Sequence, residues 1–139
     1  MRITAGTRRV VRNSAGNCCE YCHSPEPFSP SSFSIEHIDP RSQGGDDDVK
    51  NLALSCQECN NRKYVSTSAR DPLSGEIVFL FHPRRNIWSD HFVWNDDFTV
   101  LLGLTKTGRA TIEKLQLNRK SLVNLRRILH QSRLHPVPE

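Results

Sequence analysis

The stretch "SIEHIDPRSQGGDDDVKNLALSCQECNNRK", residues 34–63, carries the features that decide the fold. Residues 33–38 and 49–55 each alternate and are rich in strand-forming residues, while "DPRSQGGDDD" between them consists of turn-forming types. This pattern predicts a β-hairpin with a long loop. Beyond Cys56 there is no Gly or Pro until Pro72, which favours a short helix. The expected local order is strand, loop, strand, helix.

The cysteines add a second signal around this hairpin. Two Cys-x-x-Cys pairs, Cys19/Cys22 and Cys56/Cys59, can supply four thiolates to one tetrahedral zinc ion, which leaves Cys18 over. The alternatives are two unrelated thiol pairs or a redox dithiol. A redox dithiol usually occurs singly and near a βαβ pattern, which this sequence lacks. The spacing therefore predicts a structural zinc site.

Zinc also accounts for the folding of a region with a small core. Residues 18–63 contain few large apolar side chains, and regions of this kind usually need a metal or a disulfide for stability. Zinc binding would then form part of the folding free energy. The ion would fix the two ends of segment 23–55 together.

Taken together, these motifs resemble the HNH (ββα-metal) endonuclease family in its zinc-bearing form. The resemblance covers about residues 18–65 and rests on pieces that occur in the family's order: Cys19-x-x-Cys22, Glu36-His37-Ile38-x-Pro40, Gly44-Gly45, Asn51-Leu52 and Cys56-x-x-Cys59-Asn60-x-x-Lys63. It implies an α+β fold, a small zinc-stapled ββα-metal module. It also implies a metal-dependent endonuclease that hydrolyses phosphodiester bonds in nucleic acid, with DNA as the expected substrate and RNA as the alternative.

His37 is the expected general base, because neutral imidazole can take a proton from water near neutral pH. The resemblance implies that Glu36 and Asn60 hold a catalytic Mg²⁺ or Mn²⁺, and that Asn51 bonds the loop backbone and so positions His37. Neighbours in a strand point to opposite faces, so Glu36 and His37 can serve one site only if the strand is distorted or ends there. Asn60 stands where the family name has His, and Glu36 also offers oxygen, which suits Mg²⁺ better than a strong transition-metal site.

Each assignment has a plainer alternative. Glu36 could be a surface carboxylate and Asn60 a helix N-cap. Three bases near the site could hold phosphate or be ordinary surface charges: Arg41, Arg62 and Lys63. The acids at 46–48 are most simply solvated loop residues.

The length of 139 residues suits one domain, with the HNH core at 15–70 and a strand and helix extension at 71–139. In the extension, a strand is expected within 75–83 and two strands within 90–105, joined by a turn at Asn95–Asp97. Residues 108–134 have helical periodicity, and Asn118 could cap a second helix after a break. Arg119, Arg126 and Arg133 form a basic stripe that is either a solvated helix face or a surface along a phosphate backbone.

The charge pattern and composition point to the partner and the compartment. The net charge of +4 conceals an acidic centre, with eight acids against two bases in residues 13–60, between two basic flanks. Such flanks suit a polyanion such as DNA. No apolar run approaches the ~20 residues of a membrane span, and the start lacks a signal-peptide core, so a cytoplasmic monomer or homodimer is expected. Two other classes remain open: a non-catalytic zinc-stabilised nucleic-acid-binding module, and a structural zinc domain that binds a protein.

Overall fold

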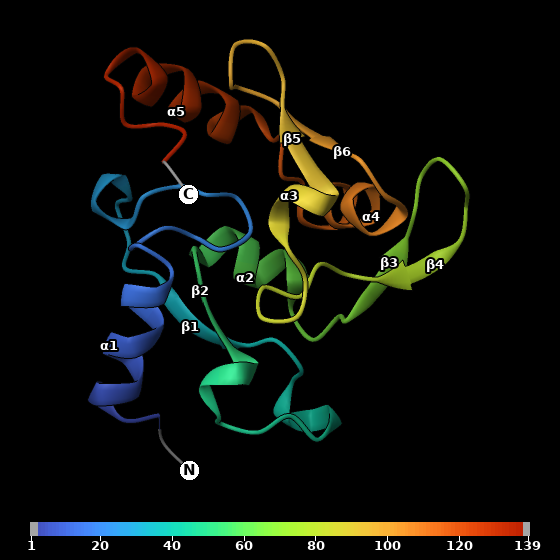
Figure 1. The fold of residues 1–139 in the computed structure, drawn as a ribbon. Helices are drawn as coiled ribbons and strands as arrows, with labels where there is room; N and C mark the ends of the chain where they lie inside the picture. The colour runs from blue at the N-terminus through green and yellow to red at the C-terminus, as the bar shows by residue number, and fades with distance from the viewer. Residues whose placement is uncertain (1–2, 138–139) are drawn as a thin grey trace. The chain divides into compact units, whose positions relative to one another are not determined.

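A computed structural model describes residues 3–137 and has the expected α+β composition of helices and small antiparallel hairpins (Figure 1). The chain forms two compact units. Unit 1 contains the residues up to Thr67 together with His82–Asn86, and unit 2 contains Ser68–Phe81 and the residues from Ile87 onward.

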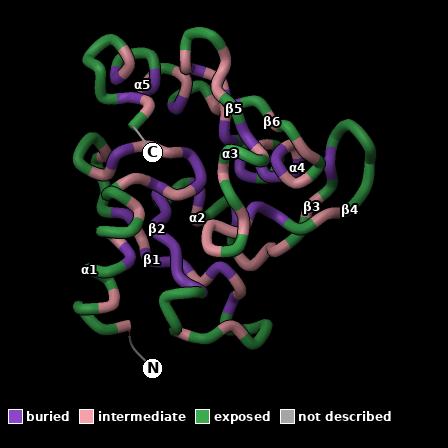
Figure 2. The backbone as a smooth tube through the Cα atoms, viewed as in Figure 1, coloured by how far each residue is buried: buried purple, intermediate pink, exposed green. Residues whose placement is uncertain are grey.

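Unit 1 contains the predicted strand–loop–strand–helix, preceded by a further helix. Its elements in chain order are α1 (Ala5–Ser14), a 3₁₀ helix (Glu26–Phe28), β1 (Ser34–His37), 3₁₀ helices at Arg41–Gln43 and Val49–Asn51, β2 (Leu52–Ser55) and α2 (Gln57–Lys63). β1 and β2 pair antiparallel, with Glu36 opposite Ala53 and His37 opposite Leu52. All four residues of β2 are buried, and Figure 2 shows this strand as a continuous buried segment.

Helix α1 is absent from the sequence-based expectations. Its N-cap is Thr4, whose hydroxyl accepts a hydrogen bond from the Thr7 N–H, but Val11 is its only buried residue. A helix that buries a single side chain leaves little hydrophobic periodicity in the sequence. Helix α1 is attached to the rest of unit 1 by contacts to later residues: the Arg12 guanidinium contacts the Glu26 carboxylate at 3.1 Å and the Phe33 carbonyl at 3.2 Å.

Unit 2 is built from two further hairpins and three helices. Its elements are β3 (Ser68–Arg70), β4 (Ile77–Phe79), α3 (Trp88–His91), β5 (Phe92–Trp94), β6 (Leu101–Gly103), α4 (Lys106–Leu115) and α5 (Lys120–Gln131). β3 pairs with β4, and β5 pairs with β6. The expected turn between β5 and β6 is present, where the Asn95 amide oxygen accepts from the N–H groups of Thr99 and Val100. Among residues 3–137, no helix has the length and apolar character needed to cross a bilayer.

The expectations for Asn118 and Arg126 are wrong. The N-cap of α5 is Arg119, and the Asn118 amide instead bonds both the N–H and the carbonyl of Leu101, at 2.7 and 2.8 Å. Arg126 is only 2% exposed, so it can neither be solvated nor lie along phosphate. Its side chain bonds the carbonyl oxygens of Thr99 and Leu117, which ties α5 to the rest of unit 2.

Candidate functional site

The long loop between β1 and β2 is held closed by the Asn51 side chain. The Asn51 Oδ1 accepts from the Asp39 N–H at 2.8 Å, and its Nδ2 donates to the carbonyls of Asp39 and Asp46 at 3.0 and 2.9 Å. The Asn51 side chain is buried, so these three bonds replace the hydrogen bonds to water that its amide would otherwise make. Asn51 thus fixes Asp39, two residues past the end of β1, against Asp46 on the other side of the loop.

Two glycines permit this closure for different reasons. Gly44 has a φ of 89°, a left-handed conformation that disfavours residues with a Cβ. At Gly45 the restriction is space, because an added Cβ would lie 1.7 Å from the Asp39 carbonyl oxygen and 2.9 Å from the Asn51 Nδ2. The Gly-Gly pair therefore allows the loop backbone to approach both Asp39 and Asn51.

His37 lies at the end of β1 and contacts an acid from the loop. Its Nε2 is 2.7 Å from the Asp47 Oδ1, and both side chains are 18% exposed. A carboxylate can only accept a hydrogen bond, so Nε2 carries the proton and the neutral ring keeps its lone pair on Nδ1. Arg41 donates to the same oxygen through Nε at 3.0 Å and Nη2 at 2.8 Å. These bonds, first from His37 and then from Arg41, lower the pKa of Asp47.

The Glu36 side chain is buried in the interior of unit 1 rather than exposed on its surface. Its Oε2 accepts from the Tyr21 hydroxyl at 2.5 Å, and its Oε1 lies 3.2 Å from the Lys63 Nζ. Lys63 also donates to the Ile38 carbonyl at 2.9 Å. Burial raises the pKa of the Glu36 carboxyl, while the Lys63 charge and the Tyr21 hydrogen bond act in the opposite direction. The alternative of a surface carboxylate is therefore wrong.

Asn60 lies on the same face of α2 as Lys63, because residues three apart in a helix are neighbours. α2 contacts β1, and Lys63 directs this face toward Glu36. Asn60 is inside the helix, whose N-cap is Cys56, so the N-cap alternative for Asn60 is wrong. Its amide makes no hydrogen bond with any part of the chain from residue 3 to 137, so the side-chain oxygen has no protein donor on this face.

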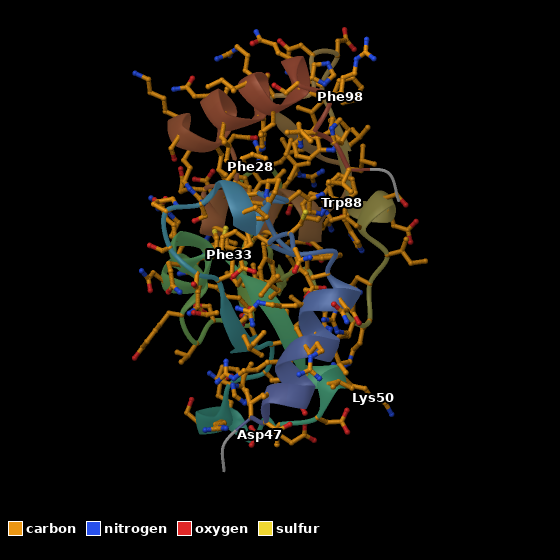
Figure 3. All side chains as sticks on the ribbon, turned by 90° about the vertical axis from the view of Figure 1, so that its left-hand side faces the viewer. Phe28, Phe33, Asp47, Lys50, Trp88 and Phe98 are labelled. Atoms are coloured by element: carbon orange, nitrogen blue, oxygen red, sulfur yellow. The ribbon has the colours of Figure 1, made fainter. Side chains whose placement is uncertain are left out.

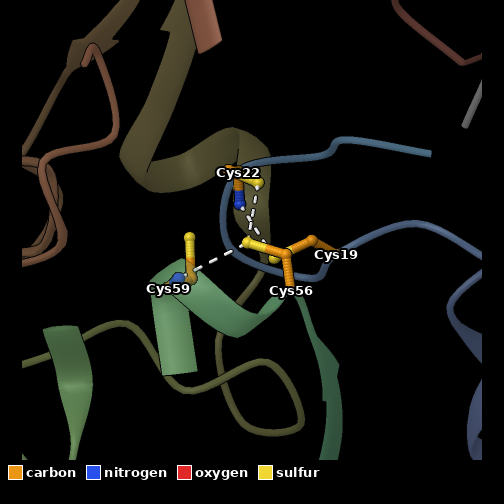
Figure 4. A group of neighbouring side chains, drawn as sticks. All are labelled: Cys19, Cys22, Cys56 and Cys59. Carbon is orange, nitrogen blue, oxygen red and sulfur yellow. Dashed lines mark hydrogen bonds between the residues drawn. The ribbon is translucent and has the colours of Figure 1, made fainter. Parts of the chain in front are cut away.

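The four predicted cysteines come together in a buried cluster (Figure 4). Cys19 and Cys22 come from the loop after α1, and Cys56 and Cys59 from the start of α2. Their sulfur atoms all lie within 4.8 Å of one another, and Cys22 and Cys56 are 3.8 Å apart. Zn–S bonds of ~2.3 Å in a tetrahedron place sulfurs about 3.8 Å apart. The Cys19 and Cys56 sulfurs each accept a backbone N–H within the pair, from Cys22 and Cys59. The donor set therefore fits tetrahedral zinc, and Cys18 lies outside it.

The three bases expected near phosphate occupy different environments. Arg41 is exposed and contacts Asp47, which Figure 3 labels at the hairpin loop. Arg62 is on the outer face of α2 and pairs with Glu58 at 3.0 Å. Lys63 is 1% exposed and committed to Glu36 and the Ile38 carbonyl. A phosphate contact by Lys63 would require this buried pair to separate.

The site thus combines a cysteine cluster, a hairpin ending in His37, and a helix that starts at the cluster, which defines a ββα-metal module. Residues 19–66 match the family model for HNH endonuclease, and this segment is an HNH domain with a buried four-cysteine cluster. Searches of curated proteins and of solved structures return no match.

Two residues of the site were missed by the sequence-based reasoning. The sequence predicts Asp46, Asp47 and Asp48 alike as solvated loop acids, yet of the three only Asp47 bonds His37. Tyr21 lies between two zinc-type cysteines, and its hydroxyl bonds Glu36. The run of three acids offers no local signal for which of them faces His37. The Tyr21 position did carry a signal, since a large aromatic between two buried cysteines is expected to be buried too.

Proposed function

We propose that this HNH domain is a metal-dependent nuclease that hydrolyses phosphodiester bonds in nucleic acid, with DNA as the expected substrate. The observation that carries the proposal is the His37–Asp47 contact at the end of β1, directly beside the buried Glu36 carboxylate. The end of β1 at His37 supports the proposal, because neighbouring residues of a strand can serve one site only where the strand ends or is distorted.

His37 takes a proton from the attacking water through Nδ1. The ionised Asp47 accepts from Nε2, so it selects the tautomer in which Nδ1 is free to act as base. It also stabilises the imidazolium that forms after proton transfer. Arg41 holds the same Asp47 oxygen and thus limits the movement of the carboxylate. Asn51 anchors the loop on either side of this pair, through Asp39 and Asp46.

Glu36 and Asn60 are the proposed ligands of the catalytic ion. A carboxylate and an amide oxygen on facing elements match the hard oxygen donors that Mg²⁺ and Mn²⁺ take. Both Glu36 oxygens are engaged in the structure, Oε1 by the Lys63 ammonium and Oε2 by the Tyr21 hydroxyl. Because an ammonium and a metal ion compete for the same carboxylate, Glu36 would bind the ion only after Lys63 moves away from it. When bound there, the ion would neutralise charge on the scissile phosphate and stabilise the departing 3′ oxygen. The family logic implies products with a 5′ phosphate and a 3′ hydroxyl.

Cys19, Cys22, Cys56 and Cys59 are proposed to bind a structural zinc ion. Their role is to fix the start of α2 and thereby the direction in which Asn60 projects, one residue past Cys59. Arg41 and Arg62 are proposed to contact nucleic-acid phosphate, and Lys63 to do so only after release from Glu36. A single site cuts one strand, so a monomer would nick DNA and a homodimer could cut both strands.

A supercoiled-plasmid assay tests the proposal. The zinc-loaded protein with Mg²⁺ or Mn²⁺ should convert the plasmid to nicked or linear form, and His37→Ala should abolish conversion. Asp47→Asn should lower the rate by about 10- to 100-fold, because the amide can donate and so favours the wrong tautomer. Asp48→Asn, at the next residue of the loop, is the matched control and should cut at the wild-type rate, because Asp48 bonds the Lys50 N–H rather than His37 and an Asn oxygen can accept the same bond.

Equal cutting by wild type and His37→Ala would reject His37 as the base. If neither protein cut but both retarded DNA in a salt-dependent manner, the non-catalytic nucleic-acid-binding module would replace the nuclease. Absence of both cutting and binding would favour a structural zinc domain.

A further inference from the structure

Unit 2 contains two consecutive helices joined by a short connection. α4 ends at Leu115 and α5 begins at Lys120, and between them Gln116 adopts a left-handed conformation with φ 51° and ψ 56°. Figure 1 shows α4 and α5 as successive helices of this unit. A connection of a few residues also joins the two helices of helix–turn–helix DNA-binding motifs.

The inner side of α5 is fixed to unit 2. Leu122 and Leu129 are buried, as are Leu115 and Leu117 just before the helix. The buried Arg126 guanidinium adds bonds to main-chain carbonyls and lies 4.8 Å from the centre of the Trp94 ring. These contacts set the rotation of α5 about its own axis. The opposite face is therefore presented in one orientation.

That opposite face is polar, basic and free of acids. Its exposed residues are Lys120, Ser121, Asn124, Arg127, Ile128 and Gln131. The positions 120, 124, 127 and 131 follow helical spacing and so form one stripe. No Asp or Glu occurs between residues 114 and 137, although the whole chain has 15. Such a surface complements a polyanion, and Lys, Asn, Arg and Ser are the side chains that reach base edges and phosphates.

We propose that α5 is a recognition helix that enters the major groove of duplex DNA. Asn124 would bond an adenine edge through its amide, and Lys120 and Arg127 would contact guanine or flanking phosphates. Arg127 now donates to the Asn124 Oδ1 at 3.1 Å, which holds the two side chains together on this face. The inference goes beyond phosphodiester hydrolysis, because a helix that reads bases gives the protein a sequence preference.

The test uses full-length, zinc-loaded His37→Ala, so that bound DNA is not cut. A pool of random duplexes is enriched by binding and sequenced, and binding of the enriched sequence is measured at several salt concentrations. A defined motif is expected. Asn124→Ala should lose preference at one position by about 5- to 150-fold, the usual range for a bidentate base contact. Lys120→Ala and Arg127→Ala should each reduce the slope of log K against log salt by about 1.

Lys114→Ala, an exposed lysine at the end of α4, is the matched control and should leave both the motif and the slope within error. All variants should melt at the parent temperature, since the substituted side chains are exposed. The inference is overturned if no motif is enriched, if Asn124→Ala and Arg127→Ala keep the parent motif, or if single-stranded RNA or a protein displaces duplex DNA as the ligand of this face.

Failure of this inference and failure of the proposed nuclease function give different experimental results. Motif binding by His37→Ala without plasmid cutting by the wild type would sustain the recognition helix and reject the nuclease. Plasmid cutting by the wild type with no sequence preference would sustain the nuclease and reject the recognition helix.

Discussion

Replacement of Lys63 by Met probes the most deeply buried charge pair of the HNH domain. The side chains of Lys63 and Glu36 are 2% and 4% exposed, and the two charges lie 3.2 Å apart. Met retains much of the volume of the lysine stem but removes the ammonium, which leaves the Glu36 carboxylate buried with only the Tyr21 hydroxyl among its bonded partners. Breaking one side of a buried pair costs about 3–5 kcal/mol. We expect the unfolding free energy to fall by that amount at neutral pH.

The loss should depend on pH in a defined direction. Burial already raises the pKa of Glu36, and Lys63 opposes that rise, so removal of Lys63 raises the pKa further. A carboxyl whose folded pKa lies above its unfolded value of ~4.3 destabilises the folded state increasingly as pH rises through this interval. The deficit of Lys63→Met relative to wild type should therefore be largest at neutral pH and shrink toward pH 4.

Urea denaturation of the zinc-loaded protein at pH 7.5 and pH 5 measures both effects. Arg62→Met is the matched control, because the Arg62–Glu58 pair is exposed and such pairs contribute about 0–1 kcal/mol. The double variant Glu36→Gln/Lys63→Met should recover part of the loss, with a coupling energy of about 1–3 kcal/mol. A loss no greater than that of Arg62→Met, or one equal at both pH values, would refute the buried-pair argument.

Three further predictions address the zinc cluster, the loop and unit 2. Removal of zinc by a chelator should unfold unit 1, seen as loss of circular dichroism that returns when zinc is restored, because metal binding is part of its folding free energy. Gly45→Ala should lower the unfolding free energy by about 1–3 kcal/mol or more and lower the cutting rate, because its Cβ would meet the Asp39 carbonyl oxygen at 1.7 Å. Gly44→Ala has space for a Cβ but a φ of 89°, so it should cost only about 1–2 kcal/mol. Equal losses of unfolding free energy in the two variants would contradict the steric reasoning. Two bonds of 2.9 Å from Arg109 hold the pKa of the Asp71 carboxyl well below its usual value. The ionised Asp71 carboxylate should therefore stabilise the fold fully above about pH 4, and this stabilisation should be lost as pH falls further. The melting temperatures of wild type and Asp71→Asn should accordingly converge in acid.

Local chemistry explains which parts of the fold could be predicted. The hairpin, the turn at Asn95–Asp97 and the helices after Thr105 follow from short-range signals: alternation, turn residues and helical periodicity. β3 and α1 gave no such signal, because β3 is a three-residue strand formed only by pairing with β4, and α1 buries only Val11. Both elements depend on a partner that lies outside the segment itself.

The cysteine cluster and the HNH domain were determined by the sequence alone. Two Cys-x-x-Cys pairs are the spacing at which four thiolates coordinate one metal ion. The order of the motifs around them is specific to the HNH family. Which charges are buried was decided only by the tertiary structure. Lys63 and Arg126 look like surface residues in the sequence, yet both are buried and each contacts a group from a distant part of the chain. The physical reason is that a charge can be buried when a specific partner compensates its lost hydration, and that partner is brought in by long-range folding that no local pattern encodes.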